Sequence, residues 1–153
     1  MTAPITASEF RALFGCLWAV GGCAVTIRIG DQPERRAAIL MLLCWVATTI
    51  VQFLTHHMIE PVLVGDFAYG LGLLWLAARY NQGWTWFMIF FEAILFFLHA
   101  GLYQAHDHRL GLVHLVANDI MAMAGPVVLV VAALRSRHRR RRSLVSSQLV
   151  LES

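Results

Sequence analysis

Residues 37–55 read AAILMLLCWVATTIVQFLT, a continuous stretch without a charged side chain. At 1.5 Å per residue, a helix of about 20 apolar residues crosses the roughly 30 Å of hydrocarbon in a bilayer. Similar apolar segments occupy residues 10–27, 61–78, 83–105 and 110–134, with short connectors between them. Short connectors make consecutive helices antiparallel neighbours. The sequence therefore predicts an all-α fold, a polytopic membrane helix bundle with five transmembrane helices.

The composition agrees with this prediction. Of the 153 residues, 59% are hydrophobic and 14% are charged, and the mean hydropathy is +0.65, which lies outside the range of ordinary soluble domains. Cys16, Cys23 and Cys44 fall inside apolar segments without a CxxC spacing. We therefore expect the cysteines to pack as small apolar residues rather than to form disulfides or a metal site.

The arginines predict the orientation of the helices, because cytoplasmic loops retain positive charge. All 12 basic residues are arginine, and five crossings leave only Arg11 and Arg109 on one side. The other side receives Arg28, Arg35, Arg36, Arg79, Arg135, Arg137, Arg139, Arg140, Arg141 and Arg142. Four or six crossings would separate the tail from the first basic loop. We predict a protein of the cell inner membrane with the N-terminus outside and the C-terminus in the cytoplasm.

The apolar segments and the arginine-rich tail divide the chain into two regions. Residues 1–134 form the five-helix transmembrane domain, and residues 135–153 form an arginine-rich cytoplasmic tail that we expect to be disordered. The tail is interpreted as a topology anchor that contacts anionic lipid headgroups. A net charge of +3 concentrated in one tail does not indicate a nucleic-acid partner. A cleaved signal peptide at the first segment is the alternative, but it would export Arg28, Arg35 and Arg36.

Small residues predict where helices approach one another closely. Gly65, Gly70 and Gly72 lie in the third segment, and Gly125 lies beside Pro126 in the fifth. We expect Pro126 to kink its helix, because proline lacks a backbone N–H.

Ionisable side chains inside the helices are the candidates for function, because such groups are expensive in hydrocarbon and usually face a bundle interior. Asp66, His99 and His114 each lie about one turn inside the outer edge of a different helix. With His56 and His57 they form the candidate ligand set for a divalent metal such as zinc or iron. A haem site would use His99 and His114, whose depths match.

A third interpretation is a pathway for protons or ions. Glu92, His99 and His106 are spaced by seven residues and therefore share one face of the fourth segment, while Asp119 lies at intermediate depth in the fifth. A pathway would run from Asp107 and His106 through His99 to Glu92, since imidazole titrates near neutral pH.

The sequence leaves the activity open. The first hypothesis is a small inner-membrane protein with an Asp/Glu/His cluster near its outer face that binds a metal or haem. The alternatives are a non-catalytic accessory or assembly subunit, with a membrane protein or a second copy of the chain as its partner, and proton or ion translocation. In the plainest interpretation the polar groups only hydrogen-bond one another and hold the helices in register. HExxH, GxSxG and phosphate-binding loops are absent from the sequence, so no catalytic residue is predicted.

Overall fold

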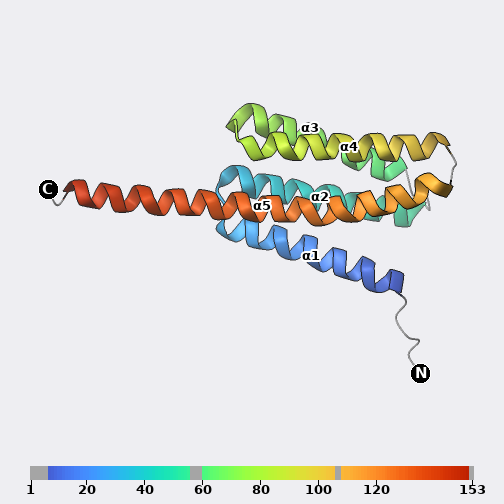
Figure 1. Ribbon diagram of the computed structural model, residues 1–153, viewed down its shortest axis with the longest axis horizontal. Coiled ribbons are helices and arrows are strands. Elements are labelled where there is room, and N and C mark those ends of the chain that lie inside the picture. The colour runs from blue at the N-terminus through green and yellow to red at the C-terminus, as the bar shows by residue number, and fades with distance from the viewer. Residues whose placement is uncertain (1–6, 56–59, 106–107, 152–153) are drawn as a thin grey trace, which may run out of the picture.

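The structure is a computed structural model that describes the backbone of residues 7–55, 60–105 and 108–151 and the side chains of residues 13–55, 60–101, 120 and 123–143. This part of the chain forms five α-helices (Figure 1). They are α1 Ala7–Ile29, α2 Gln32–Thr55, α3 Glu60–Tyr80, α4 Gly83–Ala105 and α5 His108–Leu151. The prediction of an all-helical fold is confirmed.

Three of the helices in the described residues are long and apolar enough to cross a membrane, namely α2, α3 and the Gly83–Gly101 part of α4. Leu13–Ile29 of α1 is a shorter apolar helix. The outer surface of the bundle carries large apolar side chains, with Phe53 80% exposed and Phe97 72% exposed. Such a surface is a hazard in water but suits contact with lipid. The structure therefore indicates a membrane protein.

Glycines allow close contact between helices at several crossings. A Cβ atom at Gly65 would meet the Thr48 side chain of α2, and one at Gly72 would meet Leu40 of α2. At Gly22 of α1 a Cβ atom would come within 2.6 Å of Cβ of Pro126, which is fully buried in α5. Close packing at small residues is how membrane helices associate, because lipid provides no hydrophobic drive between them.

Helix α5 is longer than the fifth apolar segment. It continues through Pro126 and on to Leu151, so residues 135–151, which we expected to be disordered, are helical in the structure. Arginine is a good helix former, and a helix that extends beyond the bundle still forms its backbone hydrogen bonds within itself. The division of the chain into a transmembrane domain and a cytoplasmic tail stays a prediction.

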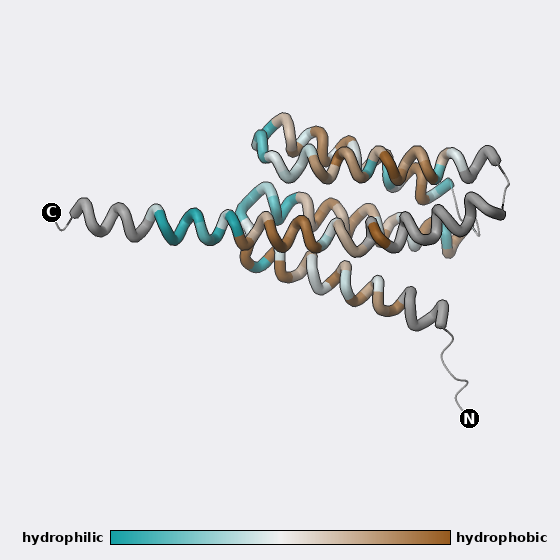
Figure 2. Tube along the Cα trace, in the orientation of Figure 1, coloured by the Kyte–Doolittle hydropathy of each residue, from teal (hydrophilic) through white to brown (hydrophobic). Residues whose placement is uncertain are grey.

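Ten of the twelve arginines lie towards one end of the bundle or on the extension of α5, and we call this end the polar end. Figure 2 shows hydrophilic residues where α1 is followed by α2, where α3 is followed by α4, and along α5 beyond the bundle. The apolar residues lie between this end and the opposite one (Figure 2). At the polar end the Asn81 backbone has a positive φ of 46°, which asparagine tolerates better than most residues.

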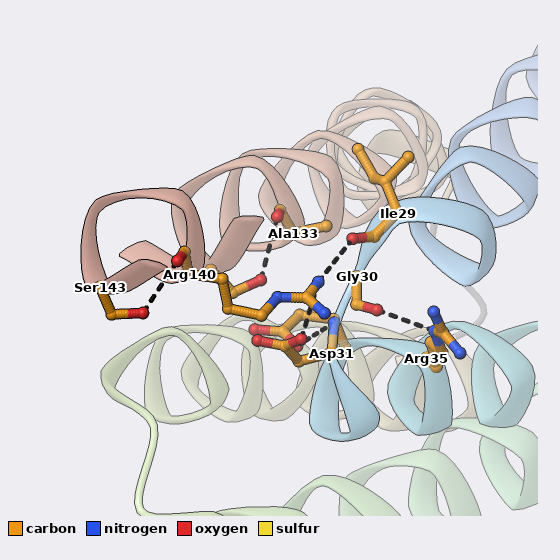
Figure 3. Close-up of polar contacts among 9 residues, drawn as sticks. Ile29, Gly30, Asp31, Arg35, Ala133, Arg140 and Ser143 are labelled. Carbon is orange, nitrogen blue, oxygen red and sulfur yellow. Dashed lines mark hydrogen bonds and ion pairs between the residues drawn. The ribbon is translucent and has the colours of Figure 1, made fainter. Parts of the chain in front are cut away.

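The extension of α5 is bound to the turn between α1 and α2 (Figure 3). The Arg140 guanidinium lies 2.8 Å from the Asp31 carboxylate and donates a hydrogen bond of 3.3 Å to the Ile29 carbonyl. Arg35 donates to the Gly30 carbonyl of the same turn at 2.8 Å. These hydrogen bonds satisfy backbone carbonyls at the C-terminal end of α1. Such carbonyls have no N–H partner within the helix itself.

Candidate functional site

The pair of Asp66 and His99 joins α3 to α4 in the half of the bundle away from the polar end. Nδ1 of His99 contacts Oδ2 of Asp66. With the carboxylate ionised, the Nδ1–H group is the donor, and the assignment of the proton depends on the histidine tautomer. His99 is only 4% exposed, so the pair is shielded from the surroundings of the bundle. The sequence analysis placed both residues about one helical turn inside the outer edge of the membrane, and the structure brings their side chains into contact.

A partly open cavity of about 300 Å³ lies between the helices and is lined by Asp66 of this pair. Each of the five helices contributes to its wall, with Cys23 from α1, Trp45 from α2, Asp66 from α3, Glu92 from α4 and Gly125 from α5. A polar cavity needs only about 10–15 Å³ of accessible volume to hold a water molecule. The cavity is therefore large enough for several waters or for a small molecule.

Glu92 brings a second carboxylate to the cavity. It lies near the middle of α4, seven residues before His99, and it shares the cavity wall with Asp66. The two carboxylates are close enough for their charges to interact. A carboxylate at this depth requires a proton, a cation or polar partners, because an isolated charge is strongly disfavoured away from water.

Tyr69 also lines the cavity, and its hydroxyl group is buried. The residue is 6% exposed, and no hydrogen-bond partner for its hydroxyl lies within the described part of the chain. This residue interacts electrostatically with Glu92, Cys23 and Cys44, which all line the cavity. A buried hydroxyl without a partner costs about 1–3 kcal/mol, and this oxygen is closed off from the open space of the cavity.

Helix α2 supplies the remaining polar wall. Thr48, Thr49 and Gln52 line the cavity from this helix. The Thr49 hydroxyl donates to the Trp45 carbonyl at 2.9 Å, which satisfies it within its own helix. The polar part of the cavity thus lies between α2, α3 and α4.

The cysteines are free thiols in the structure. Cys23 is fully buried, and its thiol lies 3.8 Å from the Met41 sulfur on α2. Cys16 is exposed on α1 and Cys44 is partly buried on α2. Their placement at helix contacts and on the outer surface agrees with a packing role.

Several predicted site residues lie outside the described residues. These are His56, His57 and His106, together with the side chains of His114 and Asp119. Among the side chains that the structure does describe, no group of three or more His, Cys, Asp or Glu residues could hold a metal ion. The metal and haem sites therefore stay predictions. Of their candidate ligands, the structure describes the side chains of Asp66 and His99.

Tyr69 and Thr48 were missed by reasoning from the sequence. Tyr69 follows Asp66 by three residues and so lies on the same face of α3, which is the signal that would have found it. An isolated tyrosine in an apolar segment resembles any other core residue, and only the structure shows that its hydroxyl is buried without a described partner.

The cavity combines two carboxylates, of which Asp66 is paired with the imidazole of His99, with room for water. Groups of this kind can bind and release protons or hold a small cation, and they provide no nucleophile of a recognised catalytic arrangement. Comparisons of the chain with family models, with curated proteins and with solved structures found no match.

Proposed function

We propose that the protein is an inner-membrane protein that crosses the bilayer five times, with the N-terminus outside and the C-terminus in the cytoplasm. The packing of the helices supports five crossings, because α1 and α5 line the same central cavity as the three long apolar helices. The ten arginines at the polar end support the orientation, since the side of the membrane that retains basic residues is the cytoplasm.

Fusions to reporter proteins test this topology. Green fluorescent protein fused after Ser153 or after Gln82 should fluoresce, and alkaline phosphatase fused at the same positions should be inactive. A fusion within residues 56–59 should give the opposite pattern. Active phosphatase at the C-terminus would contradict the orientation, and equal patterns at residues 56–59 and at Gln82 would contradict the number of crossings.

For the activity, we propose that the protein carries protons across the membrane and that the cavity forms part of the path. The observation that carries this proposal is the contact between Asp66 and His99 beside Glu92 in one cavity with room for water. A proton would move between the carboxylate of Glu92 and the Asp66–His99 pair through water held in the cavity. The outer segment of the predicted pathway would pass through His106.

Proton flux in proteoliposomes tests the proposal. With a pH-sensitive dye inside and a potassium diffusion potential across the membrane, the parent protein should carry protons and Glu92→Gln should not, because an amide cannot release one. Glu60→Gln is the matched control, since Glu60 lies at the exposed start of α3. Circular dichroism and size-exclusion chromatography should show that both variants fold. Equal flux in the parent and Glu92→Gln would refute the proposal.

Metal or haem binding is the second candidate, because the structure brings two of the predicted ligands, Asp66 and His99, into contact. The purified protein would then contain stoichiometric metal, or show a Soret band that His99→Ala abolishes. Background metal content and a featureless visible spectrum would remove this candidate. Co-purification of a stoichiometric membrane protein would instead favour an accessory subunit.

A further inference from the structure

Arg36 of α2 is held against two aromatic rings of α3 at the polar end of the bundle. Its guanidinium carbon lies 5.7 Å from the ring centroid of Trp75 and 5.7 Å from that of Tyr80. Both distances are within the range of cation–π contacts. The Tyr80 hydroxyl donates a hydrogen bond of 3.3 Å to the side chain of Gln32, which joins the same two helices. These contacts fix the position of an exposed guanidinium at the surface of the protein.

The contacts of Arg36 differ from those of other arginines at the polar end. Arg35 donates to the Gly30 carbonyl, and Arg140 pairs with the Asp31 carboxylate. Arg36 is held through ring faces, and a cation–π contact does not use up the five N–H donors of a guanidinium. Within the described residues, no carbonyl or carboxylate accepts a hydrogen bond from Arg36. Its donors are therefore available to a bound acceptor.

Acidic residues are scarce at the polar end. Asp31 and Glu34 belong to the turn between α1 and α2 and the start of α2, and the turn between α3 and α4 has no acidic residue. The Asp31 carboxylate is paired with α5 (Figure 3), and Glu34 is 1% exposed and accepts a hydrogen bond from the Asp31 N–H. Arg79 is exposed one turn after Trp75 on the same face of α3. A group bound at Arg36 should therefore carry negative charge and no positive charge.

Exposed apolar side chains continue from Arg36 towards the middle of the membrane. Ile39 and Leu43 follow Arg36 by three and seven residues on α2 and are exposed. Leu71, also exposed, precedes Trp75 by one turn on α3. Residues at these spacings share one face of a helix. A free phosphate ion at Arg36 would leave this apolar surface uncovered, whereas the acyl chains of a phospholipid would cover it.

We propose that Arg36, with Trp75, Tyr80 and Arg79, binds the phosphate of one anionic phospholipid in the cytoplasmic leaflet. The guanidinium donates two parallel hydrogen bonds to the phosphate oxygens, and the two rings lie at the level of the headgroups, where tryptophan and tyrosine are common. Phosphatidylglycerol carries the required negative charge, whereas the ammonium group of phosphatidylethanolamine would be repelled by two arginines. This site lies on the bundle, apart from the extension of α5. It depends on the proposed topology and not on proton transport.

Binding of single lipids to the purified full chain tests the site. Native mass spectrometry in detergent micelles should show one phosphatidylglycerol that binds at least about tenfold more tightly than phosphatidylethanolamine with the same acyl chains. Inorganic phosphate and glycerophosphoglycerol have no acyl chains and should not compete at the same concentration. Equal binding of the two lipids, or displacement of phosphatidylglycerol by inorganic phosphate, would overturn the proposal.

Variants identify the site. Arg36→Gln should weaken phosphatidylglycerol binding about tenfold, because hydrogen bonds to a charged phosphate are lost. Trp75→Leu should weaken it about twofold to fivefold, as expected for an exposed cation–π contact. Arg36→Lys should recover only part of the loss, since lysine keeps the charge but lacks the planar fork.

Arg28→Gln is the matched control. Arg28 is an exposed arginine in the last turn of α1, which packs against α2 and α5, so the variant removes one charge from the same end of the bundle. It should bind phosphatidylglycerol like the parent. Circular dichroism should show that all variants fold. Equal binding by Arg36→Gln and Arg28→Gln, or full affinity in Arg36→Lys, would reveal a general effect of charge and overturn the proposal.

The proton flux assay separates this site from the proposed activity, because lipid binding is measured in micelles and flux is measured in vesicles. Selective binding of phosphatidylglycerol without proton flux would refute only proton transport. Proton flux without selective binding would refute only the lipid site.

Discussion

The Asp66–His99 pair and the Arg140–Asp31 pair both join different helices through a carboxylate, but their surroundings are opposite. The side chains of His99 and Asp66 are 5% and 17% exposed, whereas those of Arg140 and Asp31 are 54% and 33% exposed. The first pair lies between α3 and α4 inside the bundle, and the second lies at the polar end. Burial, and not the chemistry of the carboxylate, separates the two pairs.

This difference determines what each pair contributes to the protein. In water an ion pair is screened and contributes about 0–1 kcal/mol, while removal of one partner from a buried pair costs about 3–5 kcal/mol because the other polar group is left alone. The buried pair is therefore suited to function and is expensive to disturb. The exposed pair connects the extension of α5 to the turn between α1 and α2, and its loss should lower the free energy of unfolding only slightly.

The largest effect is expected from His99→Leu. It leaves the Asp66 carboxylate without the imidazole in a buried place, so the free energy of unfolding should fall by about 3–5 kcal/mol. Reversible unfolding in mixed micelles measures it. The double variant Asp66→Leu with His99→Leu should recover most of the loss, because no buried polar group then lacks a partner. An unchanged unfolding free energy in His99→Leu would show that the pair is not as buried as the structure describes.

An intermediate effect is expected from Gly22→Ala, which tests whether the helices around the cavity are tightly packed. The added Cβ would meet the rigid ring of Pro126, and such overpacking costs about 1–3 kcal/mol. Gly21→Ala is the matched control on the preceding residue, because a Cβ there has nothing within 4 Å. Equal stability of the two variants in the same unfolding assay would contradict the close α1–α5 contact.

The smallest effect is expected from Arg140→Gln at the polar end. Loss of the exposed pair with Asp31 should lower the free energy of unfolding by no more than about 1 kcal/mol. The difference from the parent should shrink further in 1 M salt, where the screening length falls to about 3 Å. Arg141→Gln, also exposed, serves as the control. A loss above about 2 kcal/mol would show that the exposed pair contributes as much as a buried one.

Part of the candidate site was predictable. The spacing of polar residues from the helix ends placed Asp66 and His99 at a common depth, and these residues meet in the structure. The lateral arrangement of the helices was not predictable, because depth along a helix does not state which neighbour a side chain faces. For this reason Tyr69 was overlooked, and the helical state of residues 135–151 was not anticipated from their arginine content alone.

The sequence by itself determined the helices, because apolar length and the position of arginines are local properties of the chain. All five helices appear where apolar segments were found, with α2 beginning earlier, at Gln32, and α5 ending later, at Leu151. The tertiary structure alone decided that Tyr69 and Glu92 share a cavity with Asp66, which is paired with His99. That arrangement depends on contacts between residues far apart in the chain, such as Gly22 with Pro126, and no local pattern specifies them.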